Sequence, residues 1–279
     1  SVLTQARPPL LPTLVLVLVT ALYLEGVRRL RARGDGWGWG REVAFLTGVL
    51  TLAVALLSGL EAYDTTLFGV HMVQHMLLAM VAPVFLALGA PVTLALRTLP
   101  GHPRGVLLSV LHSRVARVVT FPAVPWVIFI GSPFALYFSG WYPATLDHRW
   151  LHDLMHLHFV LAGSLFFWPI IGVDPVPGRV PHPIRILLLF ATMPFHAFLG
   201  IAIMGVEGNG NGLLAPEHYL PLVGRAEAVF QQQVGGGLIW ASGDLVGLLF
   251  IFVAAVQWMQ ASEREAARED RRLDRLEAR

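Results

Sequence analysis

Long apolar stretches separated by short polar segments dominate the pattern along the chain. About seven of these stretches are long enough to cross the hydrocarbon of a bilayer, which takes roughly 20 residues in a helix. They lie near residues 10–27, 43–60, 70–90, 118–138, 151–171, 184–205 and 235–257. The pattern predicts an all-α fold, a polytopic integral membrane bundle of about seven transmembrane helices, with the lipid bilayer as its surroundings.

The composition agrees with a membrane protein. Of the 279 residues, 55% are hydrophobic and 14% are charged, and the mean hydropathy is +0.63. A soluble domain of this length carries far more charge. Arginines follow the first apolar stretch, whereas a cleavable signal peptide has its positive charge in front, so we expect this stretch to be retained as a span.

The arginines predict the orientation of the bundle. Of the 20 basic residues, 17 fall in alternate connections and in the last segment if the N-terminus is outside: Arg28, Arg29, Arg31, Arg33, Arg41, Arg97, Arg104, Arg114, Arg117, Arg179, Arg185, Arg264, Arg268, Arg271, Arg272, Arg275 and Arg279. Arg7, Arg149 and Arg225 then lie outside. Because cytoplasmic loops retain positive charge, the sequence predicts the N-terminus outside and the C-terminus in the cytoplasm.

The last segment differs from the rest of the chain. Residues 1–260 contain the apolar stretches and are expected to form the transmembrane domain, whereas residues 261–279 alternate Glu and Arg at helical spacing. We interpret this segment as a charged cytoplasmic helix or tail. The basic residues are spread over several segments without interleaved aromatic residues, so no nucleic-acid partner is expected.

Two histidine pairs carry the strongest chemical signal. His71 and His75 are four residues apart, as are His152 and His156, and each pair begins a membrane helix on the same predicted outer side. Residues four apart on a helix share one face, so each pair presents two imidazoles to a single ion or cofactor. His196, on the sixth stretch beside Pro194, is expected at a similar depth. Histidines within a membrane are usually functional, so we predict a metal site.

The ligand types narrow the choice of metal. The chain contains no cysteine, which excludes thiolate sites and leaves His, Met and oxygen ligands. Met72 and Met76 are either packing residues or copper ligands, although they are rotated by about 100° from the histidine face. Soft thioethers favour Cu(I), but imidazole suits copper, zinc and iron alike, so the identity of the metal or cofactor stays open among copper, zinc and haem.

Further polar residues accompany the histidines. His148 extends the His152 stripe if the fifth helix begins early, and Asp153 lies beside it. Asp244, inside the seventh stretch, either accepts an N–H from a ligating imidazole or bonds Ser242 and a neighbouring helix. Glu61 and Asp64, just before the third stretch, are expected to be interfacial residues.

The motifs resemble a known family. The segment His71-Met72-Val73-Gln74-His75-Met76-Leu77-Leu78, followed by Pro83 and by Gly89-Ala90-Pro91, resembles the CtaG-type cytochrome c oxidase assembly factors. The His152-x-x-x-His156 pair, Met193-x-x-His196 and Gln232-Gln233-x-Gly235-Gly236 ahead of Trp240 follow in the family's order, so the resemblance spans nearly the whole chain. Where the family is expected to have Asp-Gln-Gln, this chain has Gln231-Gln232-Gln233.

The resemblance implies a location, partners and a site. Members are bacterial plasma-membrane proteins of about seven helices that serve the biogenesis of haem-copper oxidases and are associated with copper. The partners implied are oxidase subunits and a soluble extracytoplasmic copper chaperone, and a homo-oligomer stays open. The implied metal ligands are His71, His75, His152, His156 and His196, with Gln232 or Gln233 nearby.

The leading hypothesis is a copper-binding assembly protein that is not an enzyme and that holds copper at the outer leaflet for insertion into an oxidase subunit. The first alternative is a haem-binding or redox membrane protein, because imidazoles from two facing helices also serve as axial haem ligands. The second is a copper transporter, which requires a polar path across the whole membrane. A metal hydrolase is disfavoured, because a site of four imidazoles leaves no open position for substrate.

Overall fold

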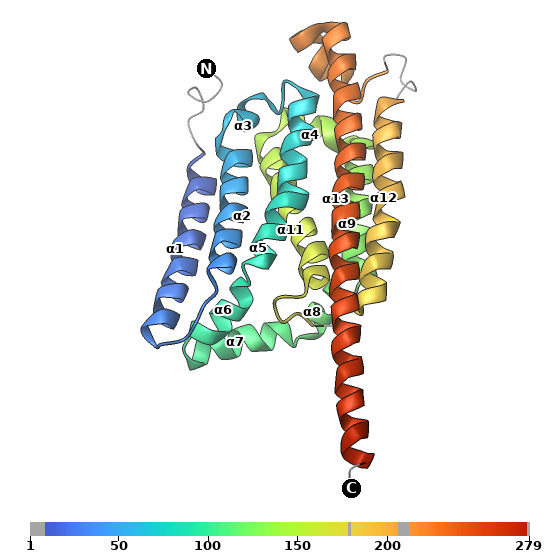
Figure 1. Cartoon of the computed structure of the whole chain (residues 1–279). Helices are drawn as coiled ribbons and strands as arrows, with labels where there is room; N and C mark the ends of the chain where they lie inside the picture. Colours follow the sequence, from blue (N-terminus) through green and yellow to red (C-terminus); the bar gives the residue numbers. More distant parts are fainter. Residues whose placement is uncertain (1–8, 178–179, 206–211, 278–279) are drawn as a thin grey trace.

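The computed structural model describes residues 9–177, 180–205 and 212–277, and all regular elements in these ranges are helices (Figure 1). In order they are α1 (Leu10–Ala32), α2 (Trp39–Leu57), α3 (Gly59–Tyr63), α4 (Phe68–Met76), the π-helical η1 (Leu77–Val81), α5 (Ala82–Leu88), α6 (Pro91–Thr98), α7 (Gly101–Leu111), α8 (Arg114–Val119), α9 (Ala123–Tyr137), α10 (Trp141–Asp147), α11 (Arg149–Ile171), α12 (His182–Met204) and α13 (Pro216–Glu277). The predicted all-α class is confirmed.

The number of membrane-spanning helices also matches the prediction. Within the described ranges, 6 helical units are long and apolar enough to cross a membrane, and up to 7 if α9 and α10, which are bent by 72°, form one span. The fourth span is shorter than expected, because α9 begins only after Pro122 and ends at Tyr137. The predicted connection over 91–117 is also helical, and α6 and α7 fill most of it.

The helices form an elongated bundle (Figure 1). α1 and α2 lie side by side at one edge, α4, α5 and α11 occupy the middle, and α12 and α13 lie at the other edge, with α9 behind them. The beginning of α1 and the end of α13 lie at opposite ends of the molecule, and we call the end where α1 begins the upper end. α13 breaks at Gly224, whose φ of +76° favours glycine, and its last turns extend below the bundle.

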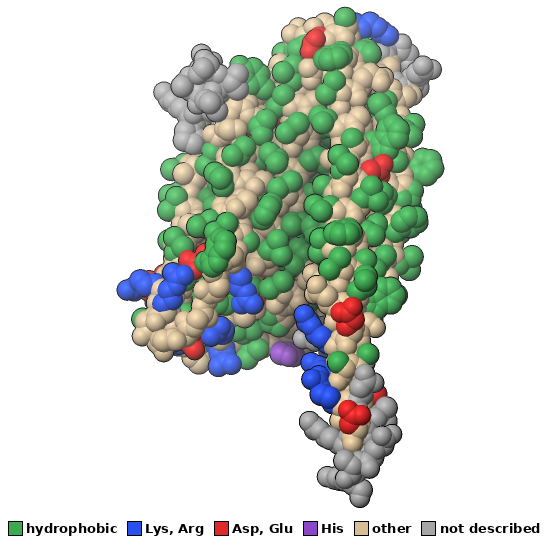
Figure 2. Space-filling model, in the orientation of Figure 1, with side chains coloured by type: hydrophobic (Ala, Val, Ile, Leu, Met, Phe, Trp, Pro, Cys, Tyr) green, Lys and Arg blue, Asp and Glu red, His purple; other side chains and the backbone are tan. Residues whose placement is uncertain are grey.

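The surface separates apolar from charged side chains. Figure 2 shows hydrophobic side chains along the length of the bundle, while Arg side chains gather around its lower end and on the extension of α13. Arg7, Arg179 and Arg279 lie outside the described residues. Most described arginines thus lie at one end of the bundle, as the arginine pattern predicts. The assignment of this lower end to the cytoplasm stays a prediction.

A break in the third span brings α11 close to it. α4 continues into α5 through η1, and Pro83 follows η1. Proline has no N–H and its ring clashes with the carbonyl four residues earlier, here Ala79, which accounts for a local widening of the helix. Gly163 of α11 packs on this carbonyl, since an added Cβ would lie 1.9 Å from Ala79 O. Only glycine permits this approach, which holds α11 against the third span.

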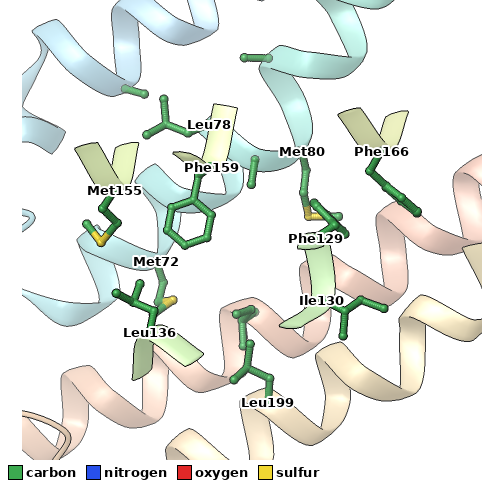
Figure 3. Close-up of a cluster of buried hydrophobic side chains, with 14 of the residues drawn as sticks. Met72, Leu78, Met80, Phe129, Ile130, Leu136, Met155, Phe159, Phe166 and Leu199 are labelled. Carbon is green, nitrogen blue, oxygen red and sulfur yellow. The ribbon is translucent and has the colours of Figure 1, made fainter. Parts of the chain in front are cut away.

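An apolar layer supports the upper part of the bundle. Figure 3 shows Met72, Leu136, Met155 and Phe159 projecting into one cluster from α4, α9 and α11. All four side chains are buried, and Met72 is fully so. The residues next to them on α4 and α11 include the two histidine pairs, so these histidines lie inside the bundle.

Candidate metal centre

The two histidine pairs meet between α4 and α11. The ring centroids of His71 and His75 are 4.0 Å apart, and those of His152 and His156 are 4.5 Å apart. Across the two helices, His71 lies 5.7 Å from His152 and His75 lies 6.1 Å from His156. Counting backbone and side chain together, none of the four residues is more than 4% exposed. The structure therefore brings four predicted ligands into one buried cluster, which we call the histidine cluster.

A carboxylate from a short turn joins this cluster. Ser58 caps α3 by accepting a hydrogen bond from the Leu60 N–H, and the chain then turns so that Asp64 points inward. Asp64 is 1% exposed. Its Oδ2 lies 2.7 Å from His152 Nε2 and 3.7 Å from His156 Nε2. The ring of His218 holds the same turn by a 2.7 Å contact between its Nε2 and the Thr65 carbonyl.

A phenol from α9 contacts the other pair. The hydroxyl of Tyr137 lies 2.7 Å from His75 Nδ1 and donates to Met72 Sδ at 3.8 Å. Because the Tyr137 hydroxyl donates its hydrogen bond to the Met72 thioether, its oxygen can accept a hydrogen bond from the His75 Nδ1–H. That bond leaves His75 Nε2 without a proton. In the same way, a bond from His152 Nε2–H to Asp64 leaves His152 Nδ1 free. Outer-shell oxygens of this kind select the nitrogen that binds a metal.

Several buried nitrogens of the histidine cluster have no hydrogen-bond partner. They are both ring nitrogens of His71, His75 Nε2, His152 Nδ1 and His156 Nε2. Buried polar atoms are almost always paired, because losing water without a replacement is costly. Five such atoms in one cluster fit a bound metal ion, and imidazole suits copper, zinc and iron.

Two groups of ligand atoms are tight enough to hold one ion. In the part of the chain that the structure describes, the ligand atoms of Asp64, His152 and His156 lie within 4.8 Å of one another. We call this group the inner site. Those of Glu61, Asp153 and His156 meet the same criterion, and we call them the rim site. His71 and His75 contact the inner site through their rings without belonging to either group.

The remaining predicted histidines lie apart from the histidine cluster. His196 is buried on α12, where its Nδ1 contacts the Thr192 carbonyl at 3.2 Å and its ring lies 5.7 Å from Phe129. Among the described ring contacts of His196, none involves another histidine. His148 precedes α11 as its N-cap and is exposed, so it does not extend the helical stripe.

Of the residues predicted to support the metal site, some lie at the histidine cluster and others lie away from it. Met72 lies against Tyr137 at the edge of the histidine cluster, while Met76 is a half-buried packing residue. Asp153 is exposed and pairs with Arg149. Asp244 accepts a hydrogen bond from Trp240 Nε1 at 2.8 Å on its own helix, and its carboxylate is close enough to His196 for an electrostatic interaction. Its described hydrogen bonds include neither an imidazole N–H nor Ser242.

The glutamines at the start of the seventh span bind backbone groups. Gln231 accepts from the Gly69 N–H at the beginning of α4. Gln232 is buried, accepts from the Leu214 N–H and donates to the carbonyls of Ile203 and Gly212. Gln233 is exposed and donates to the Met204 carbonyl. These side chains fasten helix ends, and their described contacts do not include the histidines.

Three residues of the site were missed by sequence reasoning. Asp64 was expected at the membrane interface, and that expectation is wrong because its side chain is buried against His152. Glu61, also expected there, has a side chain only 9% exposed, which contacts Gln74 Nε2 and approaches His156. Tyr137 carried no signal in the sequence, because its partner His75 is 62 positions away.

Comparison with known proteins shows which family this chain resembles. The family model described as cytochrome c oxidase caa3 assembly factor (Caa3_CtaG) matches residues 21–261. The chain is 41% identical over 265 residues to an uncharacterized protein of Mycobacterium bovis and 40% identical over 260 residues to one of Mycobacterium leprae. These alignments cover 92% and 90% of this chain but only 40% and 39% of the relatives, so the chain spans about two fifths of their length. No solved structure matches it.

Proposed function

The chain belongs to the cytochrome c oxidase caa3 assembly factor family, and on that premise we propose that it holds copper at the histidine cluster and delivers it to an oxidase subunit. It acts as a carrier rather than an enzyme. The observation that carries the proposal is the set of buried imidazole nitrogens without partners on α4 and α11. In an apolar interior these atoms are costly unless an ion occupies the space between them.

The donor set favours copper over the other metals. His71, His75, His152 and His156 supply nitrogen ligands, and Asp64 orients His152 by its contact with the Nε2 atom. For nitrogen and oxygen sites of a given shape, Cu²⁺ binds more tightly than Zn²⁺ or Fe²⁺. The chain has no cysteine, so in this proposal the copper is held without thiolate.

The packing of the histidine cluster argues against haem. The ring of His75 lies 4.2 Å from Phe159, and the ring of His71 lies 5.2 Å from Tyr142. A porphyrin coordinated here would have to displace these aromatic rings. A single ion needs no such rearrangement.

The upper end of the bundle is the outer side in this proposal. The histidine cluster lies near the start of α4 and α11, and the arginines gather at the opposite end. With the lower end in the cytoplasm of a bacterial cell, copper is held near the outer leaflet of the plasma membrane. There it meets an extracytoplasmic copper chaperone on one side and haem-copper oxidase subunits on the other.

Complementation in cells tests the delivery role. A bacterial strain that lacks the chain's gene is expected to contain oxidase with reduced copper content and activity. The wild-type chain restores both, whereas the His75→Ala, His156→Ala double variant restores neither at equal membrane abundance. Full restoration by the double variant would contradict the proposal. The control is His158→Ala, a half-buried histidine of α11 outside the cluster, which is expected to restore both.

A further inference from the structure

A series of ionisable side chains connects the upper surface with the histidine cluster. The exposed fractions of these side chains fall from the surface inward: Arg149 63%, Asp153 58%, Glu61 9%, His156 5% and Asp64 2%. On other sides the cluster is covered by buried apolar and aromatic residues such as Phe68 and Met155. An ion that reaches the buried histidines therefore finds polar atoms along one route.

Successive polar side chains along this route approach one another within 4 Å. Arg149 Nη2 lies 2.5 Å from Glu61 Oε1, and Arg149 Nε lies 3.2 Å from Asp153 Oδ1. The other oxygen of Glu61, Oε2, is 3.8 Å from His156 Nδ1. On its far side, His156 Nε2 is 3.7 Å from Asp64 Oδ2. His156 thus has the rim site on one ring nitrogen and the inner site on the other.

Two features distinguish the rim site from an ordinary surface ion pair. Its histidine is buried, and the Nδ1 atom of that histidine lies 3.8 Å from Glu61 Oε2. Its two carboxylates both pair with the guanidinium of Arg149, so one cation already bridges them. The exposed side chain of Arg149 can leave for water easily, because exposed ion pairs are weak and screened by salt.

We propose that the metal enters through the rim site by displacing the Arg149 guanidinium from Glu61 and Asp153, and then passes to the inner site by ligand exchange around His156. This inference rests on the proposed function, since it assigns the route to the site that holds copper. A divalent ion carries twice the charge of the guanidinium and gains an imidazole ligand, so it replaces the arginine. Arg149 returns to the carboxylates once the ion has moved inward, which closes the route.

The rate of copper loading tests the route. Purified full-length protein in detergent is mixed with Cu²⁺ buffered by glycine, the reaction is stopped with EDTA at set times, and protein-bound copper is counted. Asp153→Asn removes one rim ligand and is expected to slow the initial rate roughly tenfold, the low end of the range for a lost attractive charge. Arg149→Gln removes the competing cation and is expected to speed loading.

Matched controls separate the route from general electrostatics. Asp147→Asn and Arg225→Gln make the same charge changes at exposed positions of α10 and α13 outside both sites. They are expected to load at the wild-type rate. Wild-type rates for Asp153→Asn and Arg149→Gln, or equal changes in their controls, would overturn the route while leaving the proposed function standing. A wild-type protein that takes up no copper would overturn both.

Discussion

At the scale of single residues, two oxygen atoms determine which histidine nitrogens are available. Asp64 Oδ2 lies 2.7 Å from His152 Nε2 and the Tyr137 hydroxyl lies 2.7 Å from His75 Nδ1. Each oxygen favours the tautomer that leaves the opposite ring nitrogen, His152 Nδ1 or His75 Nε2, without a proton. A carboxylate in this position also fixes the orientation of the imidazole ring that it binds. In the proposed copper site, the affinity for the metal therefore depends on Asp64 and Tyr137 as well as on the histidine pairs.

Asp64→Asn tests this dependence. Asparagine keeps the volume and an acceptor oxygen, but it removes the negative charge next to His152 and His156. The expected result is a copper affinity lower by about 10–100-fold, the usual cost of losing an outer-shell partner, measured by competition with a chromophoric chelator. Asp147→Asn, an exposed aspartate at the end of α10, should bind copper like the wild type. Equal affinities of the two variants would show that Asp64 plays no part.

The sequence predicts histidine pairs better than it predicts their partners. His71 and His75 share a helix face, so their spacing alone predicts that they act together. Asp64 and His152 are 88 positions apart, and only the tertiary packing of the α3 turn against α11 joins them. His196 was placed by its depth in the membrane, which does not specify the direction in which a side chain points around its helix.

At the scale of elements, the histidine cluster depends on how closely α11 approaches the third span. Apolar length predicted both spans, because spanning hydrocarbon requires a minimum number of residues. It did not predict η1 or the bend between α9 and α10, since the first break lies beside Pro83 and the second at the turn of Ser139 and Gly140, and neither changes the hydropathy of the span. The contact between Gly163 and Ala79 fixes the spacing of the two helices only 7 positions from His156 in the chain.

Gly163→Ala tests this spacing. The new methyl group would overlap the Ala79 carbonyl, so α11 must move away from η1, and overpacking of this kind typically costs about 1–3 kcal/mol. We expect a lower thermal unfolding temperature in detergent and weaker copper binding. Gly131 of α9 has nothing within 4 Å of an added Cβ, and Gly131→Ala is expected to keep or slightly raise the unfolding temperature. Similar behaviour of the two variants would contradict the packing account.

At the scale of the whole molecule, the bundle places a polar cluster at one end and most arginines at the other. The arginine count along the sequence predicted this asymmetry, and the surface in Figure 2 has the same one-sided form. The positive-inside rule then assigns the lower end to the cytoplasm. Copper delivery on the outer side depends on this orientation.

Cysteine labelling tests the orientation of the bundle in the membrane, and the chain has no native cysteine that would react with the label. Asp147→Cys places a thiol at the upper end, and Glu265→Cys places one on the lower part of α13. In intact spheroplasts, a membrane-impermeant maleimide is expected to label the first variant and not the second, which reacts only after permeabilisation. The reverse pattern would put the histidine cluster on the cytoplasmic side.

The most direct test of the central claim is elemental analysis of the detergent-purified protein, recorded together with its visible spectrum. The wild type and the His158→Ala control are expected to contain close to stoichiometric copper, without a Soret band. The His75→Ala, His156→Ala double variant is expected to lose that copper while still eluting as a folded protein. Unchanged copper in the double variant, or haem absorbance in the wild type, would contradict a copper site built from the histidines of α4 and α11.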